Sequence, residues 1–360
     1  MTQRERQILQ LIETNPMISQ QELADELGIT RSSVAVHISN LMAKGQIAGR
    51  GYVLRTGRYV VVVGGVNMDI GGKSYAPLVA SDSNPGKVKL SLGGVGRNIA
   101  HNLSLLGADV RMLTAFGDDV YGQKVVASCA ELGIDIGHAC RVPDGVTSTY
   151  LYLMDDKGEM ALAVSDMEIC KKITPAYLSS NMGLLQNAQL VIVDANIPQE
   201  SLIWLAENCT APLFCDPVST AKAEKLRPIL DRIHTLKPNR LEAELLSGMK
   251  IESKADMEKA ADKLMERGVN RLFISLGGGG VFAAMGKEKL WLPNLPGKMV
   301  NTTGCGDAFM AAIGWAYLEG LGLKETALAG LAAGCISMES EETINPAMSA
   351  TAIKDRMKLN

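Results

Sequence analysis

The chain of 360 residues has few aromatic residues, no long apolar run and no excess of charge of one sign. Aromatic residues make up 4% of it, so apolar packing must rest on aliphatic side chains and methionine, which favours a helix-covered parallel sheet over a β-sandwich. No apolar run approaches the ~20 residues of a membrane-spanning helix. The 36 basic and 39 acidic residues nearly balance, so the total charge demands neither nucleic acid nor a membrane as a partner.

The seven cysteines are scattered, and no two of them form a Cys-x-x-Cys pair. This spacing favours reduced thiols and predicts no zinc site. The first residues are polar and helix-forming, without the apolar segment of a secretory signal. We therefore expect a cytoplasmic protein with no membrane partner. The length suggests two domains, or one large domain with a smaller one attached.

Residues 1–57 predict a small domain of three helices followed by a hairpin. Capping boxes at Thr2-x-x-Glu5 and Ser19-x-x-Glu22 each begin an amphipathic segment, and Thr30 caps a third. Residues 45–54 read as a tight β-hairpin. The arrangement resembles a winged helix-turn-helix domain. Its apolar positions are Ile8, Leu9, Leu11, Ile12, Leu23, Ala24, Leu27, Val34, Ile38 and Leu41.

DNA is the partner that this first domain suggests. The third helix would expose Arg31, Ser32, Ser33 and His37, and the hairpin would present Arg50; these residue types contact phosphates and base edges. Residues 1–58 hold seven basic and five acidic groups, a net charge of +2, which is a weak footprint for DNA binding. A degenerate module kept for dimerisation or stability is the alternative.

From residue 58 onward, short β-branched runs alternate with amphipathic segments. We predict strands at 60–63, 110–115, 190–193, 213–216 and 272–276, and helices at 97–106, 122–132 and 255–267. This alternation predicts an α/β domain over residues 58–360, with a mainly parallel sheet and helices on both faces. Two segments, about 70–92 and 146–165, are richer in turns and in strand-like alternation.

The segment Asn301-Thr-Thr-Gly-Cys-Gly-Asp307 is the most informative in the chain. Two glycines let backbone N–H groups face a ligand, and an apolar helix predicted to begin near Ala308 adds positive partial charge. The amides of Gly304, Cys305 and Gly306 could hold a developing anion, and Asp307 could take a proton from an attacking hydroxyl. These are the requirements of phosphoryl transfer to an alcohol. A glycine turn that merely caps a buried helix is the alternative.

Two further segments place polar residues at the carboxyl edge of the sheet. Asn67 and Asp69 follow the strand at 59–63 and its Gly-Gly turn, and Asn98 lies in the glycine-rich segment that begins at Gly93-Gly94. Asp69 is suited to bind a pair of hydroxyls. The alternatives are a simple turn cap at Asn67 and Asp69 and tight helix–strand packing at the glycines.

Asn239 and Glu242 stand three residues apart at the start of a predicted helix, so both lie on one face. Their oxygen atoms suit Mg²⁺ beside a triphosphate. The strand at 272–276, which includes Ser275, breaks into the glycine run 277–280. A solvated helix face and a plain hairpin are the respective alternatives.

Taken in their order along the chain, these five segments resemble the ribokinase-like (PfkB) family of sugar and nucleoside kinases, from about residue 59 to the end. The resemblance implies an ATP-dependent kinase in which Asp307 is the base and the two turn-rich segments form a small β-lid over the sugar site. It implies sugar contacts from Asn67, Asp69, Gly93, Gly94 and Asn98, ATP contacts from Asn239, Ser275, Gly277, Gly278 and Gly280, and Mg²⁺ near Asn239 and Glu242.

Within the family, the segments 82–103, 148–167, 215–219 and 233–244 are similar to bacterial pseudouridine kinases. This likeness implies phosphorylation of the 5′-hydroxyl of pseudouridine, with Ser148, Thr149 and Asp166 near the base. Inosine, cytidine and ribose stay open as acceptors, and so does a transcription regulator that uses a kinase fold as a ligand sensor. Family members often dimerise through their lids, so we expect a homodimer.

Two positions depart from the family pattern. Asn301 stands where many members have an aspartate associated with a monovalent-cation site; its carbonyl could still serve, so the sequence leaves a requirement for K⁺ open. Cys305 stands where the family usually has alanine. A thiol at a helix N-terminus can have raised thiolate character, which suggests sensitivity to oxidation, whereas a small residue that simply fits is the alternative.

Overall fold

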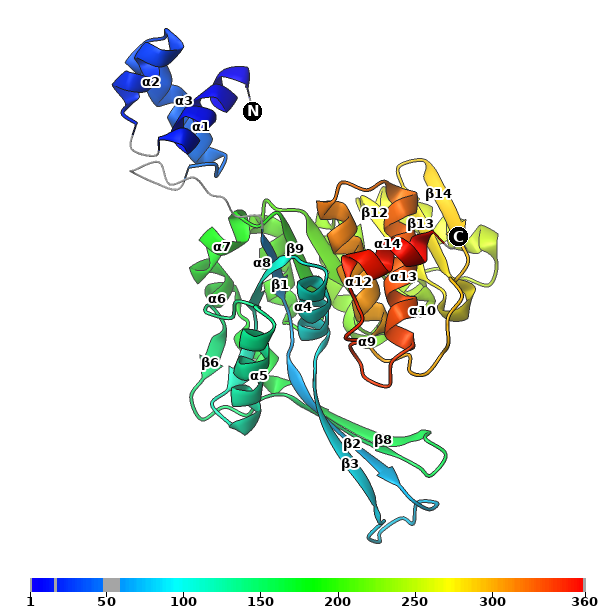
Figure 1. The fold of residues 1–360 in the computed structure, drawn as a ribbon. Helices are drawn as coiled ribbons and strands as arrows, with labels where there is room; N and C mark the ends of the chain where they lie inside the picture. Colours follow the sequence, from blue (N-terminus) through cyan, green and yellow to red (C-terminus); the bar gives the residue numbers. More distant parts are fainter. Residues whose placement is uncertain (1, 16–17, 48–58, 359–360) are drawn as a thin grey trace. The chain divides into compact units, whose positions relative to one another are not determined.

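The computed structural model describes residues 2–15, 18–47 and 59–358. The chain divides into two compact units, Met1–Arg58 and Tyr59–Asn360. Each unit has apolar clusters of its own, one in the first unit and two in the second. Figure 1 shows the helices of the first unit and the sheet-based body of the second.

In its described residues, the first unit consists of α1 (Gln3–Thr14), α2 (Gln20–Leu27) and α3 (Arg31–Ala43). Both predicted capping boxes are present, and Gly28 ends α2 in the left-handed region at φ 61°. The core holds the predicted apolar residues, except that Leu9, Leu11 and Leu27 are only partly buried at its border. The predicted hairpin at 45–54 lies largely outside the described residues, and Arg50 lies outside them altogether.

An ion pair between the buried Glu5 and the half-exposed Lys44 links the beginning of α1 to the end of α3. The Glu5 side chain is 1% exposed, and its two oxygens accept hydrogen bonds from Lys44 Nζ at 2.7 and 2.9 Å. The hydrogen bond from Lys44, and then that from the Thr2 backbone, lower the pKa of Glu5 to about 2. The first unit therefore contains a carboxylate that depends on one lysine for its charge balance.

The second unit is built on an eight-stranded sheet with the order β14-β13-β12-β11-β10-β9-β1-β4. All neighbours from β4 to β12 run parallel, and β13 and β14 add an antiparallel edge. The predicted fold class is therefore confirmed. The strands are β1 (Tyr59–Val63), β4 (Asp109–Leu113), β9 (Leu190–Asp194), β10 (Leu213–Asp216), β11 (Thr235–Leu236), β12 (Arg271–Ser275), β13 (Val281–Met285) and β14 (Glu288–Leu292), with a small pair β5 (Ala115–Gly117) and β6 (Cys140–Val142) beside them.

Helices cover both faces of this sheet because its central strands are apolar on both sides. In β1, Val60 and Val62 belong to one core, and Tyr59, Val61 and Val63 to the other. The first core contains α4 (Val95–Leu105), α5 (Val120–Glu131), α12 (Cys305–Leu318), α13 (Leu323–Met338) and α14 (Ala350–Met357). The second contains α6 (Pro175–Ser180), α7 (Met182–Gln186), α8 (Gln199–Asn208), α9 (Thr220–Ala223), α10 (Arg240–Ser247), α11 (Lys254–Glu266) and the 3₁₀ segments η1 (Glu168–Lys172) and η2 (Glu224–Arg232).

A separate four-stranded sheet projects from this body (Figure 1) and occupies the two segments predicted for the lid. Its strands are β2 (Asn67–Ser74), β3 (Gly86–Gly93), β7 (Thr149–Met154) and β8 (Met160–Asp166), in the order β3-β2-β7-β8. The register separates two faces. The aliphatic face carries Val88, Leu90, Leu151, Leu153, Leu162 and Val164, which are between 40% and 68% exposed.

Candidate active site

The polar residues of the predicted site lie where parallel strands end at one edge of the sheet. The chain passes from β1 to the edge strand β4 on one side and later to β9 on the other, so this edge contains the point where the strand order reverses. Asp194 fixes the backbone here. It is fully buried at the end of β9, and its Oδ2 accepts hydrogen bonds from the N–H groups of Gly65 (3.0 Å) and Gly96 (2.7 Å).

The helix behind the glycine turn begins at Cys305, three residues earlier than predicted. Gly304 is its N-cap at φ 83°, and a Cβ there would collide with the Thr343 carbonyl oxygen. Cys305, Gly306 and Asp307 therefore form the first turn of α12, whose N–H groups have no partner within a helix. This cradle is positively polarised and can stabilise an anion.

Asp307 is partly buried in this first turn and has a shifted proton affinity. Burial, and then the negative charge of Asp216, raise the pKa of Asp307 to about 8, against the opposing effects of Asn98 and Lys237. Asp307 Oδ2 accepts a hydrogen bond from Asn98 Nδ2 at 2.8 Å. A carboxyl group with a pKa near the working pH is suited to act as a general base.

Asn98 joins the acceptor side of the site to Asp307, although 209 positions separate the two residues in the sequence. Its Oδ1 atom is buried and has no hydrogen-bond partner among the described residues. A buried acceptor without a partner is costly, so this atom is suited to receive a hydrogen bond from a ligand hydroxyl. The sequence predicted that Asn98 faces the sugar; the structure adds its link to Asp307.

Asp69 is held at the base of the lid by its neighbours. Asn67 Nδ2 donates a hydrogen bond to Asp69 Oδ1 at 2.5 Å, and a Cβ on Gly93 would collide with Asp69 Oδ2. Gly94 has φ 99°, and a Cβ there would lie 2.5 Å from the Gly65 carbonyl oxygen. Burial raises the pKa of Asp69, against the opposing effects of Asn67 and Arg97. The two glycines thus leave room for a carboxylate at the sheet edge.

Two of the three residues predicted near the base do not share a face with Asp69, and the third, Ser148, is buried before β7 begins. Ser148 is 1% exposed, with its Oγ 3.9 Å from Cys170 Sγ. Thr149 pairs with Met68 and Asp166, so Thr149 and Asp166 point to the aliphatic side of the lid. The prediction of these residues rested on the resemblance to pseudouridine kinases and did not include the two-residue period of the strands.

Two tyrosines that the sequence analysis passed over share the face of Asp69 instead. Tyr150 pairs with Asp69 across β2 and β7, and Tyr152 lies two residues further along the same face. The Tyr152 ring covers Gly71, where an added Cβ would lie 2.5 Å from the ring, and the ring centroids of Tyr150 and Tyr152 are 5.7 Å apart. Every second residue of β7 lies on the side of Asp69. This two-residue period is the signal by which the two tyrosines could have been predicted.

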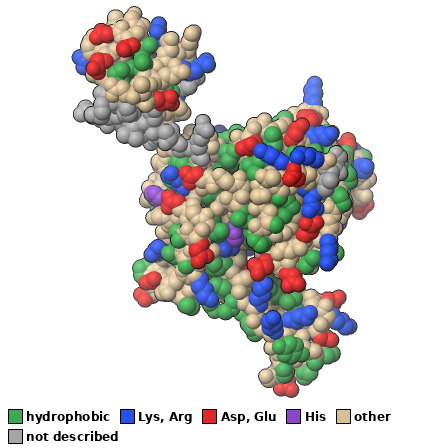
Figure 2. Space-filling view, viewed as in Figure 1, with side chains coloured by type: hydrophobic (Ala, Val, Ile, Leu, Met, Phe, Trp, Pro, Cys, Tyr) green, Lys and Arg blue, Asp and Glu red, His purple; other side chains and the backbone are tan. Residues whose placement is uncertain are grey.

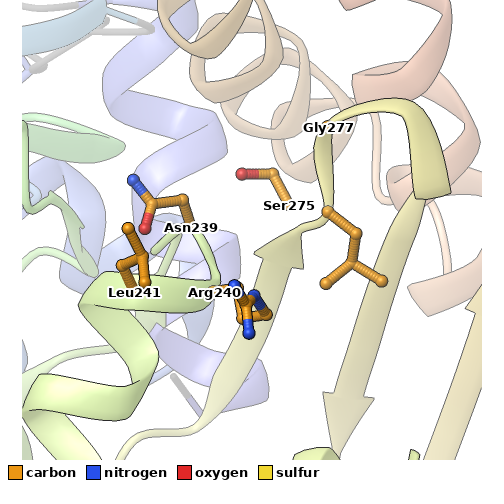
Figure 3. A pocket seen from close by; sticks show the side chains of 6 residues that line it. Asn239, Arg240, Leu241, Ser275 and Gly277 are labelled. Carbon is orange, nitrogen blue, oxygen red and sulfur yellow. The ribbon is translucent and has the colours of Figure 1, made fainter. Parts of the chain in front are cut away.

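A cavity of about 300 Å³ lies beside the ends of β11 and β12. Figure 3 shows Asn239 and Ser275 on facing sides of it, and the two residues form an isolated parallel bridge. The glycine run follows Ser275: Gly277 and Gly280 have φ 54° and 92°, and an added Cβ on Gly278 would meet nothing within 4 Å. The lining consists of Asn239, Arg240, Leu241, Ser275, Leu276 and Gly277.

Asn239 and Glu242 form the capping box of α10. Asn239 Oδ1 accepts from the Glu242 N–H at 2.9 Å, and Glu242 Oε2 accepts from the Asn239 N–H at 2.8 Å. Glu242 is 3% exposed, and burial raises its pKa against the effects of Asn239 and Lys237. Within the described residues, no group of three His, Cys, Asp or Glu could hold a metal. A Mg²⁺ ion held mainly by phosphate and water needs only one or two protein groups, and the Glu242 carboxylate beside Asn239 is of the type that it takes.

Cys305 and Asn301, the two residues that depart from the family pattern, each have a defined local environment. Burial, and then the nearby Asp307, raise the pKa of the Cys305 thiol, which is the opposite of the thiolate character suggested by its helix position. Asn301 Oδ1 accepts a hydrogen bond from the Thr303 N–H at 3.0 Å, so the Asn301 side chain shapes the turn before the cradle.

Lys237, between β11 and Asn239, is a site residue that the sequence analysis did not select. It is 6% exposed, its Nζ lies 3.2 Å from Asp216 Oδ2, and a Cβ on Gly306 would lie 3.5 Å from the same nitrogen. Nothing in its sequence context distinguishes it from a lysine at an ordinary strand end.

The predicted DNA-contacting side of the first unit is α3. Arg31 and Ser32 are exposed, whereas Ser33 and His37 are partly buried. Val36, which the prediction did not include, is 60% exposed.

Comparisons with known proteins agree with this geometry. The profile of the pfkB family of carbohydrate kinases matches residues 58–350, and that of a winged helix-turn-helix DNA-binding domain matches residues 1–48. The chain therefore belongs to the pfkB family, and it is an ATP-dependent kinase of a hydroxyl acceptor with an N-terminal winged helix-turn-helix domain. Both predicted resemblances are confirmed. In the described part of the chain, no helix has the length and apolarity needed to span a membrane.

The chain is similar to two proteins of Escherichia coli K12. It is 40% identical over 354 residues to the uncharacterized sugar kinase YeiI, covering 97% of each chain, and 42% identical over 300 residues to a pseudouridine kinase, covering 82% of this chain and 95% of the other. Among solved structures, it resembles a ribokinase from Thermotoga maritima with a TM-score of 0.76 at 25% identity, covering 84% of this chain and 99% of the other.

Proposed function

We propose that this kinase phosphorylates the 5′-hydroxyl of a nucleoside and that the nucleoside is pseudouridine. The likeness to a pseudouridine kinase supports the choice of acceptor. The observation that carries the nucleoside assignment is the pair Tyr150 and Tyr152 on the face of Asp69. Aromatic rings offer a nucleobase a stacking surface, for which a kinase of free sugars has no use.

In this proposal, Asp69 and Asn98 Oδ1 accept hydrogen bonds from the sugar, and Asp307 takes the proton of the attacked hydroxyl. The amides of Gly304, Cys305 and Gly306 hold the transferred phosphoryl group. Ser275 and the glycines Gly277, Gly278 and Gly280 lie along the nucleotide, beside Asn239. Glu242 and Asn239 would hold Mg²⁺, which neutralises charge on the phosphates when bound.

A coupled assay of ADP release tests the acceptor with pseudouridine, uridine, cytidine, inosine and ribose. We expect the highest kcat/KM with pseudouridine. Tyr152→Leu should lower kcat/KM for the nucleoside about 5- to 150-fold, since stacking contributes ~1–3 kcal/mol per base, and Tyr152→Phe should keep it. Ribose turnover should be equal in wild type and both variants. Preference for ribose would contradict the nucleoside assignment, and preference for another nucleoside would contradict pseudouridine alone.

We also propose that the first unit binds DNA through α3. The match to a DNA-binding family and the exposed Arg31 and Ser32 support this role, and exposed Val36 could contact a thymine methyl group. A gel shift with the DNA upstream of the gene, at two salt concentrations, is the test. Arg31→Ala should weaken binding and reduce its salt dependence, because one phosphate contact is lost. Absence of a specific shift at low salt would contradict the proposal.

Finally, we propose that the kinase is a homodimer that pairs through the aliphatic face of its lids. Six aliphatic side chains on one exposed sheet face form a continuous apolar surface, which monomeric proteins rarely present to water. Figure 2 shows hydrophobic and basic side chains together on the lid.

A further inference from the structure

Lys237 and Asp216 form a buried ion pair directly beside the anion-binding turn. Asp216 ends β10 and is 5% exposed, and Lys237 follows β11 and is 6% exposed. Lys237 Nζ lies 3.2 Å from Asp216 Oδ2. A Cβ added to Gly306 would lie 3.5 Å from the same nitrogen. The ammonium group thus lies close to a carboxylate and to the first turn of α12.

The charges around this nitrogen keep it protonated. Burial acts to lower the pKa of Lys237, but the negative charges of Asp216, Glu242 and Asp307 outweigh it, and the pKa is raised. Lys237 in turn opposes the rise in the pKa of Asp307. A positive charge therefore lies in contact with Asp216 and within the electrostatic influence of Glu242 and Asp307, next to the first turn of α12.

Stability alone is a weak reason for such a pair. A buried ion pair loses its hydration, and replacing both charges with apolar groups of similar size is often neutral or stabilising. An ammonium group has three donors, and the contact with Asp216 directs one of them. The remaining donors can serve a ligand on the side of Gly306.

We propose that Lys237 is a catalytic residue that contacts the transferred phosphoryl group and that Asp216 is the residue that positions it. In the transfer, the acceptor oxygen bonds to the γ-phosphorus while the bond from phosphorus to the ADP oxygen breaks. The proton of the hydroxyl goes to Asp307, and the electron pair of the broken bond stays on ADP. The ammonium group stabilises the negative charge on the oxygens of the moving group together with the amides of α12.

The test removes both charges at once, so that no unpaired charge is left in the interior. The double variant Asp216→Asn/Lys237→Met is compared with Asp262→Asn/Lys289→Met, which removes the same two residue types from a more exposed pair between α11 and β14, with an Nζ–Oδ1 distance of 2.6 Å. Three quantities are measured: kcat and KM with the acceptor that the wild type turns over best, the Kd of ADP with Mg²⁺, and the same Kd with aluminium fluoride, which imitates the moving phosphoryl group.

We expect the site variant to lose kcat by about 100-fold or more, with KM and the Kd of ADP changed by less than about threefold. Aluminium fluoride should no longer lower the Kd of ADP in this variant. In the control variant it should lower the Kd as in the wild type. Lys237→Arg, which keeps the charge, should retain part of that tightening and covers the case in which the double variant does not fold. A kcat within about tenfold of the wild type, or unchanged tightening in either variant, would overturn the proposal.

The aluminium fluoride measurement needs no acceptor. It therefore tests Lys237 even where pseudouridine proves to be the wrong substrate.

Discussion

Asp307 carries its proton more tightly than an ordinary aspartate, because it is partly removed from water and lies near other acidic groups. Its pKa rises from 3.8 to about 8, and Asn98 and Lys237 prevent a larger rise. A base with this pKa is a stronger proton acceptor than a solvated carboxylate, but it is charged in only part of the molecules at neutral pH. The raised pKa should affect the pH dependence of both the activity and the stability.

Activity should fall on the acidic side of pH 8. Asp307 must be ionised to accept the proton, so kcat/KM should decrease as the pH drops below its pKa of about 8 in the free enzyme. Asp307→Asn should lower kcat by about 100-fold or more, and its residual activity should not show this limb. A limb near pH 4 in the wild type, or near-normal turnover in the variant, would contradict the role of Asp307.

Stability should change with pH in the opposite direction. Between pH 3.8 and about 8, Asp307 holds a proton in the folded chain that it releases on unfolding, so the free energy of unfolding falls as the pH rises through this window. At pH 9, Asp307→Asn should therefore melt at a higher temperature than the wild type. Thermal unfolding at pH 5 and pH 9 measures the effect, with Asp355→Asn on the surface as a control that should show no such gain.

Gly93 should be irreplaceable for acceptor binding. A methyl group at this position would collide with Asp69 Oδ2, so Gly93→Ala should displace the carboxylate and raise KM for the acceptor about 10-fold or more, with KM for ATP unchanged. Gly183→Ala is the matched control, because its added methyl group meets nothing within 4 Å. Equal KM values in the two variants would show that Asp69 does not bind the acceptor.

Single residues could be predicted where a motif fixes the backbone as well as the side chain. Asp69, Gly93 and Asp307 belong to such motifs, and the structure brings their segments to one edge of the sheet. Lys237 could not be predicted, because its importance comes from Asp216 and Gly306, which are distant in the sequence. The contact from Asn98 to Asp307 is of the same kind.

At the level of elements, the lid is a sheet with two different sides. Its register places Asp69, Tyr150 and Tyr152 on one side and aliphatic residues on the other. The sequence predicted both lid segments, but the position of Thr149 and Asp166 on the aliphatic side follows only from the pairing of β2 with β7 and of β7 with β8. The early start of α12 escaped prediction for another reason: Cys305 and Gly306 are poor helix formers.

The aliphatic side of the lid should hold the dimer together. Leu153 and Leu162 are paired across β7 and β8, so Leu153→Lys/Leu162→Lys places two charges at the centre of the proposed interface. Sedimentation should then show a monomer, whereas Met285→Lys, on an exposed position of β13, should leave the dimer intact. A dimer that survives both lysines would rule out this face.

On the scale of the whole molecule, the two units should lose their structure separately. Lys44→Met would leave the Glu5 carboxylate buried without its partner, which destabilises the first unit and should abolish DNA binding while kinase activity persists. Gel shifts and kinase assays on the same sample measure this. Lys171→Met, which removes an exposed pair with Glu168, should change neither activity. Loss of kinase activity in Lys44→Met would show that the units depend on each other.

The same ion pair should make the first unit sensitive to acid. Glu5 has a pKa lowered from 4.5 to about 2, so the stability that it contributes is present above pH 4.5 and is lost as the pH falls toward 2. The stability that protonation of Asp307 adds to the second unit is gained between about pH 8 and pH 3.8, so it no longer changes below pH 3.8 while the first unit is still losing stability.

The hydrogen bond from Asn98 to Asp307 also limits how the gene can vary. One base change turns an asparagine codon into an aspartate codon, and at this position it would set two carboxyl groups against each other. Such a pair shares a single proton, so the base would no longer be free to take one from the acceptor. Asn98→Asp, a change that is conservative at most surface sites, would here inactivate the enzyme. Surveys of natural variation should therefore find no aspartate at position 98.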